Sequence, residues 1–428
     1  YGRLNYNFKD KYLLTATLRR DGSSRFGSDN RWGTFPSVAL AWRLKEEGFL
    51  KNIDVISNLK LRVGYGVTGQ QEGIGNYDHI AKYTYSDPTA RVQFGNQFYY
   101  LWRPDGYDPQ RKWEQTATTN IGIDWGFNDN MISGSIDYYY KHTTDLLNEI
   151  PVPMGSNFIN KIVKNIGSLD NRGIEANVNY VALDRKDMRW DIGFNITYNH
   201  TEISKLSMND GPESTYIGAP VSKISGGTSS TIQIHSVGYA PYSFYVYKQL
   251  YDVDGKPIEG AYADMNGNGK LDDGDLYRYK SPEPDVYMGL NTSFSYKKLT
   301  IATALRASLG NYAYNNVNSD MGNYSQTLNP NNFLMNTIRD INNTGFYNKQ
   351  LFSDYYIENA SFLKMDYLQF MYDLGKFSGI ADLKLNFSIQ NVFTITKYKG
   401  IDPEIAGGID NNFYPNPRTF SLGLSLNF

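Results

Sequence analysis

The chain has 428 residues and contains no apolar run of about 18 residues, which excludes membrane-spanning helices. It has no cysteine, which excludes disulfides and thiol chemistry, and its net charge of −2 gives no basic surface for a nucleic acid. Aromatic residues make up 15% of the chain, a share that suits the aromatic girdles of a membrane β-barrel or loops that stack on sugars.

Apolar and polar residues alternate along most of the chain, as in β-strands whose two faces differ. The last segment, residues 418–428, reads RTFSLGLSLNF, with Phe or Leu at every second position and Ser, Gly or Asn between them. A strand with one apolar face, one small polar face and an aromatic carboxy terminus at Phe428 favours a bacterial outer-membrane β-barrel. Charged residues fall on the polar face, as expected where Lys or Arg facing the lipid midplane costs about 2 to 4 kcal/mol.

The alternation predicts thirteen spanning strands. In chain order they are residues 2–8, 12–20, 34–44, 58–67, 115–127, 131–142, 171–181, 188–200, 284–296, 299–311, 361–374, 381–395 and 418–428. In the segment 361–374 the apolar residues change face near Leu368, which predicts a β-bulge there.

The connections between these strands alternate between short and long. The long ones are residues 21–33, 68–114, 143–170, 201–283, 312–360 and 396–417. Outer-membrane barrels have short periplasmic turns and long external loops, whereas a soluble sandwich has loops of similar length at both ends. We therefore predict an all-β fold, a transmembrane antiparallel β-barrel, with residues 1–428 as one partial barrel domain and specificity in the long loops.

The strand count also predicts what precedes the chain. If the last strand runs toward the periplasm, the strand at residues 2–8 does so too, because thirteen is odd. Single-chain bacterial barrels have an even number of strands, so an odd number is expected upstream. We expect the chain to be the carboxy-terminal portion of a larger barrel.

The segment 264–275, DMNGNGKLDDGD, matches the spacing of a twelve-residue calcium loop within the long external region 201–283. The oxygen ligands would come from Asp264, Asn266, Asn268, the carbonyl of Lys270, Asp272 and Asp275. Position 12 carries Asp in place of the usual Glu, and no helical pattern flanks the loop. The alternative is a turn rich in Asn, Gly and Asp without a metal. We predict a structural Ca²⁺ here and no required cofactor.

The chain offers little for catalysis. The motif GYGVTG at 64–69 matches a dinucleotide fingerprint, but the residues after it cannot open a helix, so we interpret the glycines as a strand leaving the barrel wall. There is no GxSxG motif and no metal-binding His pair at helical spacing, so we predict that the protein is not an enzyme. A glycosidase needs only two carboxylates, yet the candidates fit the lining of a wet lumen better. These candidates are Glu114, Asp124, Asp137 and Glu175.

An aromatic stretch lies in the long loop at 68–114. Tyr99, Tyr100 and Trp102 are candidates for stacking on a sugar ring, and Asp105 is a candidate hydrogen-bonding partner of the substrate. The alternative is that these residues pack the loop.

Ten stretches in the same order resemble the barrel of the SusC-like TonB-dependent outer-membrane transporters of Bacteroidota, over nearly the whole chain. They include DGSSRFG at 21–27, LKLRVGYGVTGQ at 59–70, WEQTATTNIGIDWGF at 113–127, NIGSLDNRGIEANVNY at 165–180 and QNVFTITKYKGIDPEI at 390–405. The resemblance implies a 22-stranded barrel in the outer membrane, with a plug and a TonB box that this chain does not include. It also implies a SusD-like surface lipoprotein as partner and oligosaccharide, or peptide, as substrate.

Three functions therefore compete. An active importer would bind a nutrient in the lumen and draw energy through TonB, which needs no nucleotide site in this chain. A passive outer-membrane channel or surface adhesin could use the same barrel without a plug. A soluble all-β glycan-binding protein or glycosidase would fold without detergent.

Overall fold

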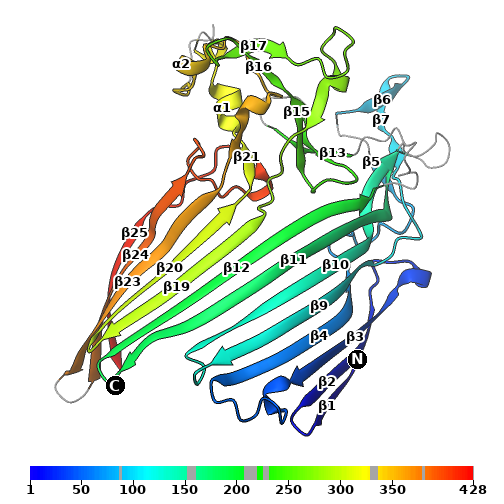
Figure 1. Ribbon diagram of the computed structural model, residues 1–428. Helices are drawn as coiled ribbons and strands as arrows, with labels where there is room; N and C mark the ends of the chain where they lie inside the picture. Colours follow the sequence, from blue (N-terminus) through cyan, green and yellow to red (C-terminus); the bar gives the residue numbers. More distant parts are fainter. Residues whose placement is uncertain are drawn as a thin grey trace.

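The computed structural model describes residues 1–85, 89–151, 161–206, 219–224, 231–327, 336–377 and 381–427. Its main element is a single sheet of 13 strands that curves like the wall of a barrel (Figure 1). The strands follow one another in chain order, β1-β2-β3-β4-β9-β10-β11-β12-β19-β20-β23-β24-β25, and neighbouring strands are antiparallel. Within the described residues, β1 and β25 therefore form the two edges of the sheet.

All thirteen predicted strands are confirmed. They are Gly2–Phe8 (β1), Tyr12–Gly22 (β2), Trp32–Arg43 (β3), Ile56–Gln70 (β4), Glu114–Phe127 (β9), Ile132–Pro151 (β10), Lys161–Arg185 (β11), Met188–Lys205 (β12), Val286–Tyr296 (β19), Leu299–Leu309 (β20), Phe362–Phe377 (β23), Ala381–Thr396 (β24) and Thr419–Asn427 (β25). The largest differences are in β10 and β11, which run well beyond the predicted ends. A spanning strand needs only about 9 to 11 residues, so these two strands extend past the bilayer, where no lipid imposes an alternating pattern.

The register of the sheet places apolar residues side by side on one face. Across the last three strands, for example, Phe387 lies between Phe370 and Leu422. Toward the other edge, Leu14 pairs with Leu40, a residue that is 54% exposed. One face of the wall is thus an exposed apolar band that suits lipid, and the opposite face is polar. Phe428 lies outside the described residues.

We call the end of the sheet with short connections the turn end, and the opposite end the loop end. At the turn end, Tyr12 stacks against Trp42 with ring centroids 6.1 Å apart. Both rings donate hydrogen bonds to the carboxylate of Glu47, at 2.8 Å from Tyr12 and 3.0 Å from Trp42, and Lys11 forms an ion pair with it at 2.9 Å. Aromatic rings with apolar bodies and bonded polar tips are typical of a membrane–water interface.

The predicted bulge in β23 is present, centred on Asp366 and not on Leu368. The pairing with β24 passes from Met365 to Tyr367 and leaves Asp366 without an opposite residue. An extra residue in one strand changes the direction in which the neighbouring side chains point. As a result Asp366 and Tyr367 both lie on the polar face, where they line the same pocket.

The interpretation of the glycines at 64–69 as a strand leaving the wall was wrong. Strand β4 continues through them and stays paired with β9 as far as Gln70. The ring of Phe35 lies over Gly69, where an added Cβ would stand 2.0 Å from its Cζ, and over Gly33, where the distance would be 2.3 Å. These two glycines leave room for the ring of Phe35, which packs with Trp113 in a buried cluster.

The loop end carries short strands and helices that form a cap beside the wall (Figure 1). They are Tyr83–Tyr85 (β5), Arg91–Phe94 (β6), Gln97–Tyr100 (β7), Trp102–Pro104 (β8), Ala219–Lys223 (β13), Thr231–His235 (β14), Ser243–Tyr247 (β15), Gln249–Tyr251 (β16), Pro257–Tyr262 (β17), Leu276–Arg278 (β18), Tyr312–Tyr314 (β21), Ile357–Asn359 (β22), Asn316–Met321 (α1) and Ile341–Thr344 (α2). A buried cluster around Phe244, Tyr314 and Tyr356 holds together the part of the cap that excludes β5 to β8. In the described part of the chain, no helix is long and apolar enough to cross a membrane.

Candidate functional site

The polar face of the wall carries paired charges. Arg62 in β4 forms ion pairs with Asp124 in β9 at 2.7 Å and with Asp137 in β10 at 3.0 Å. Glu175 lies opposite Asp137 in the register, and the carboxylate of Glu114 accepts a backbone N–H from β10 at 2.9 Å. The ion pairs of Asp124 and Asp137 with a cation from a neighbouring strand fit a hydrated wall lining, as the sequence indicated, better than a pair of catalytic acids.

A second charge cluster fixes the connection between β24 and β25 to the wall. Arg306 in β20 donates two hydrogen bonds to Asp366, at 2.8 and 2.9 Å, and also forms an ion pair with Glu404 of the connection. Lys364, whose side chain is 7% exposed, contacts Asp402 at 2.7 Å and Glu404 at 3.1 Å. We call these five residues the loop anchor. Because the loop anchor joins two strands to one loop, it fixes the position of that loop relative to the wall.

The anchor predicts a pH dependence for this loop. Hydrogen bonding from Arg306, opposed by burial and helped by Lys364, lowers the pKa of Glu404 from its usual 4.5 to about 2. The contribution of Glu404 is therefore fully present above about pH 4.5 and is lost as the pH falls through about 2. Amide hydrogen exchange in the connection, relative to the intrinsic exchange rate at each pH, should rise over that interval in the wild type, and Glu404→Gln should remove this rise. Equal pH profiles for the two proteins would contradict the assignment.

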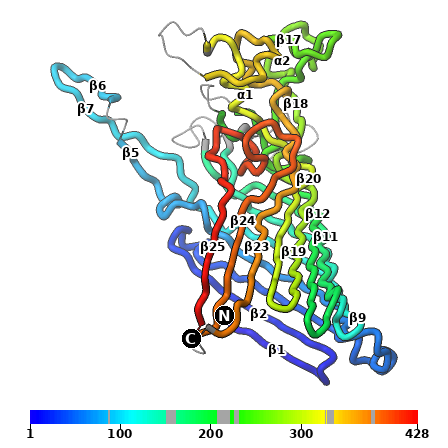
Figure 2. Tube along the Cα trace, turned by 90° about the vertical axis from the view of Figure 1, so that its left-hand side faces the viewer, coloured from blue at the N-terminus to red at the C-terminus, as the bar shows by residue number. Residues whose placement is uncertain are grey.

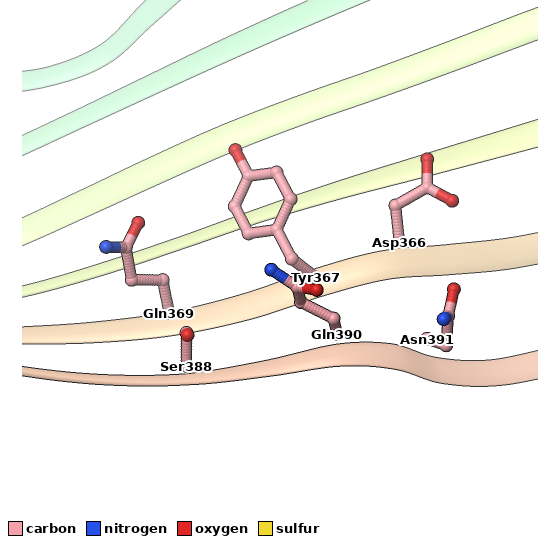
Figure 3. Close-up of a pocket in the computed structure, with 6 residues that line it drawn as sticks. All are labelled: Asp366, Tyr367, Gln369, Ser388, Gln390 and Asn391. Carbon is pink, nitrogen blue, oxygen red and sulfur yellow. The ribbon is translucent and has the colours of Figure 1, made fainter. Parts of the chain in front are cut away.

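A polar pocket of about 350 Å³ lies beside the anchor, on the polar face of β23 and β24. Its lining consists of Asp366, Tyr367, Gln369, Ser388, Gln390 and Asn391 (Figure 3). We call it the wall pocket. It combines a carboxylate, three amides, two hydroxyls and an aromatic ring, which is the chemistry that binds hydroxyl-rich or amide-rich ligands. The pocket was not predicted from the sequence, although the change of face near Leu368 indicated the bulge that places Asp366 and Tyr367 in its lining.

The predicted stacking residues lie in two paired hairpin segments, β5 with β8 and β6 with β7. These segments project from the loop end away from the wall (Figure 2), and we call them the aromatic finger, residues 83–85 and 91–104. Trp102 is 55% exposed and its ring lies 3.8 Å from that of Tyr85, which also contacts Tyr100 edge to face at 6.2 Å. The structure thus brings Trp102 and Tyr100 together through Tyr85.

The other two predicted residues stand apart from that group. Tyr99 contacts Phe94, with ring centroids 5.9 Å apart, and pairs with Val92, so it lies on the opposite face of the hairpin from Tyr100. Asp105 follows the last strand of the finger, and its carboxylate accepts a hydrogen bond from Thr84 at 3.0 Å. The four residues therefore do not form one site, and their role in binding stays a prediction.

Replacing Trp102 with Ala should weaken ligand uptake without removing the barrel from the membrane. The residue is exposed and stacks on only one neighbouring ring, so its loss removes a ligand contact and little packing. Uptake of labelled ligand by cells, with outer-membrane abundance measured in parallel, tests this. Phe94→Ala, another exposed aromatic of the finger, is the matched control, and unchanged uptake in the Trp102 variant would remove Trp102 from the site.

The carboxylates of the calcium-like loop already accept hydrogen bonds from donors within the same loop. Both oxygens of Asp264 accept backbone N–H groups of the loop, and Asp272 accepts the side-chain amides of Asn266 at 3.1 Å and Asn268 at 2.7 Å. Asp275 is buried and accepts three backbone N–H groups. Among the residues that the structure describes, no three His, Cys, Asp or Glu side chains gather as metal ligands. Binding of Ca²⁺ would require these two amides to release Asp272, and the ion stays a prediction.

The calcium prediction is checked by proteolysis of this loop. Calcium chloride should protect the wild-type protein from tryptic cleavage after Lys270, because the carbonyl of that residue would bind the ion. Asp272→Asn should abolish the protection, and magnesium chloride should give little of it. A cleavage rate in the wild type that calcium does not change would show that the loop is a metal-free turn.

Comparison with known proteins identifies the wall. Residues 1–268 match the family model described as TonB dependent receptor-like, beta-barrel. The chain belongs to this family. The TonB-dependent receptor SusC of Bacteroides thetaiotaomicron is 45% identical over 436 residues, which cover all of this chain and 43% of the relative. The TonB-dependent receptor P3 of Formosa agariphila is 32% identical, covering all of this chain and 45% of the relative.

A solved structure described as the RagAB peptide transporter superposes with a TM-score of 0.80 at 26% identity, over all of this chain and 47% of the matched chain. The chain thus spans less than half the length of the relatives it matches. The members of the TonB-dependent receptor family named here are receptors and transporters and not enzymes, and their barrels lie in the outer membrane. This confirms the SusC-like fold and location that the sequence predicted.

Proposed function

We propose that this chain is the carboxy-terminal barrel portion of a TonB-dependent importer that carries an oligosaccharide into the periplasm. The loop end faces outward, since outer-membrane barrels place long loops on the outside. The proposal extends to a SusD-like lipoprotein over the barrel mouth and to TonB, which would act on a plug encoded outside this sequence. The 45% identity to the receptor SusC over the whole chain is the observation that carries it.

The wall pocket supports a hydroxyl-rich ligand. Gln369, Gln390 and Asn391 present amides that both donate and accept, and Tyr367 offers a ring face beside them. Sugars are bound by such combinations of amides with aromatic faces. A peptide is the second candidate, because the solved structure with the TM-score of 0.80 is described as a peptide transporter and peptide groups use the same amides.

The test uses the full-length protein extracted in detergent from outer membranes. We expect a polypeptide of about twice the 48.7 kDa of this chain, purifying together with a lipoprotein. Uptake of labelled oligosaccharide by cells should stop when TonB is removed. Uptake that persists without TonB would establish a passive channel, and a soluble species of 48.7 kDa would revive the secreted glycan-binding or glycosidase alternative.

A Gln369→Ala variant tests the wall pocket within this function. Uptake should fall while the amount of barrel in the membrane stays constant. Gln93→Ala removes the same amide from the exposed finger and serves as the matched control. If both variants import at the wild-type rate, the wall pocket takes no part in transport.

A further inference from the structure

A second cavity lies in the cap at the loop end, apart from the wall pocket. It has a volume of about 440 Å³ and is formed by α1, by residues 338–343 around α2, and by the connection between β24 and β25 (Figure 1). We call it the cap pocket. Its lining includes two carboxylates, Asp340 and Asp410, and two cations, Arg339 and Lys399. The positive and negative charges of the lining are thus equal in number. Which ligand the cavity prefers depends on which of these groups already has a partner within the protein.

The carboxylate of Asp340 is fully engaged within the protein. It accepts hydrogen bonds from Asn343 at 2.9 Å, from Asn318 at 3.0 Å and from the hydroxyl of Tyr355 at 3.0 Å, and the residue is 8% exposed. Burial acts to raise its pKa, but these hydrogen bonds hold the pKa below its usual value. Asp340 is therefore an ionised part of the scaffold with little capacity left for a ligand.

The other acidic groups near the cavity are engaged as well. Asp410, which is 6% exposed, accepts a hydrogen bond from the hydroxyl of Tyr398 at 2.7 Å and one from the backbone N–H of Asn412 at 3.0 Å. Glu358 lies behind Lys399 and accepts its backbone N–H at 2.7 Å, together with the side-chain amide of Asn315 at 3.2 Å. The protein's own donors thus satisfy the acidic side of the cavity.

The two cations differ from the carboxylates in this respect. Both Arg339 and Lys399 are exposed at the cavity, and within the described residues neither forms an ion pair. The ammonium of Lys399 lies over the ring of Tyr355, at 5.5 Å from the centroid, and its charge also acts on the carboxylates of Asp340 and Glu358 without forming an ion pair with either. The carboxylates are held by donors from within the protein, whereas the two cations are exposed, so an anion that enters the cavity can contact the cations directly. Added salt screens this attraction, because the Debye length is about 8 to 10 Å at physiological salt.

An apolar contact surface accompanies these charges. Ile338 and Ile401 also line the cavity, and Ile401 is 67% exposed. A small molecule with an acidic group and a carbon face would thus find an ion pair and an apolar contact in the same place. A neutral sugar would gain only the apolar contact, so the cavity should bind an acidic molecule in preference to a neutral sugar.

We infer that the cap pocket is a binding site for a carboxylate group carried by a small polar ligand, with Arg339 and Lys399 as the groups that recognise the charge. The carboxylate could belong to an acidic sugar or to an acidic peptide side chain, which present the same chemistry to the two cations. This site stands on the cap and is independent of whether the wall pocket takes part in import.

The experiment is a calorimetric titration of the purified full-length protein in detergent with glucuronate, N-acetylglutamate and glucose. At least one acid should bind with higher affinity than glucose, and its affinity should fall as salt is added. The acid that binds better identifies the source of the carboxylate. Lys399→Gln and Arg339→Gln should each weaken acid binding about tenfold, the usual value of a hydrogen bond to a charged group. Lys399→Arg should retain it.

Lys397→Gln is the matched control, because it removes the same charge from the same loop at a residue that does not line the cavity. Glucose binding that equals acid binding would overturn the inference, as would equal losses in the Lys397 and Lys399 variants. Because binding is measured without transport, a failure of import leaves this result intact, and a failure of acid binding leaves the importer intact.

Discussion

Gly69→Ala should lower the free energy of unfolding of the barrel by about 3 kcal/mol, the largest effect that we expect from adding one methyl group. The new Cβ would stand 2.0 Å from the ring of Phe35, a distance that no side chain can occupy. Phe35 is 7% exposed and packs with Trp113, so the ring must leave a buried cluster to make room. Urea denaturation of the refolded full-length barrel, followed by its heat-modifiable band on a gel, measures the loss.

Gly64→Ala is the matched control for this effect. Gly64 lies in the same strand, and an added Cβ there would meet nothing closer than a carbonyl oxygen at 3.9 Å. It should change the unfolding free energy little. In a Phe35→Ala background, Gly69→Ala should also become nearly neutral, because the two residues share one contact. A large loss that persists in that background would place the strain elsewhere.

The strands could be predicted from the sequence because lipid on one side and water on the other force an alternation of apolar and polar residues. That rule holds along β25, whose Leu422 and Leu424 face the same way as Phe420, and all thirteen strands followed from it. It stops at the membrane surface, which is why the extra lengths of β10 and β11 were missed. The prediction for Gly69 was wrong for a related reason. This glycine leaves space for the ring of Phe35, which lies in a neighbouring strand.

The candidate site was harder to predict, because its residues come together only through tertiary structure. Lys364 and Glu404 are distant in sequence, and neither belongs to a motif. The aromatic residues Tyr99 and Tyr100 were found as a cluster in sequence, yet adjacent residues of a strand point to opposite faces, so the cluster separates in the structure. A local pattern identifies strands, whereas sites depend on which strands and loops become neighbours.

Lys364→Met should release the connection between β24 and β25 from the wall. The ammonium of Lys364 is almost buried and contacts Asp402 at 2.7 Å and Glu404 at 3.1 Å. Its two partners keep contact with water, since the side chain of Asp402 is 23% exposed and that of Glu404 is 42% exposed. The loss should therefore be smaller than the about 3 to 5 kcal/mol that breaking a fully buried ion pair costs. Arg306 would keep its two hydrogen bonds to Glu404 but has none to Asp402, so the loop should open locally while the barrel stays folded.

Limited trypsin digestion of the full-length protein measures this opening. In the variant, cleavage after Lys397 and Lys399, identified by mass spectrometry, should be faster than in the wild type. Lys384→Met is the matched control. Lys384 lies in the neighbouring strand β24, toward the turn end, and forms no ion pair among the described residues. Acid binding in the cap pocket should weaken together with the faster cleavage, since Lys399 belongs to the released loop. A cleavage rate equal to that of the control would mean that the cap, and not the anchor, holds this loop in place.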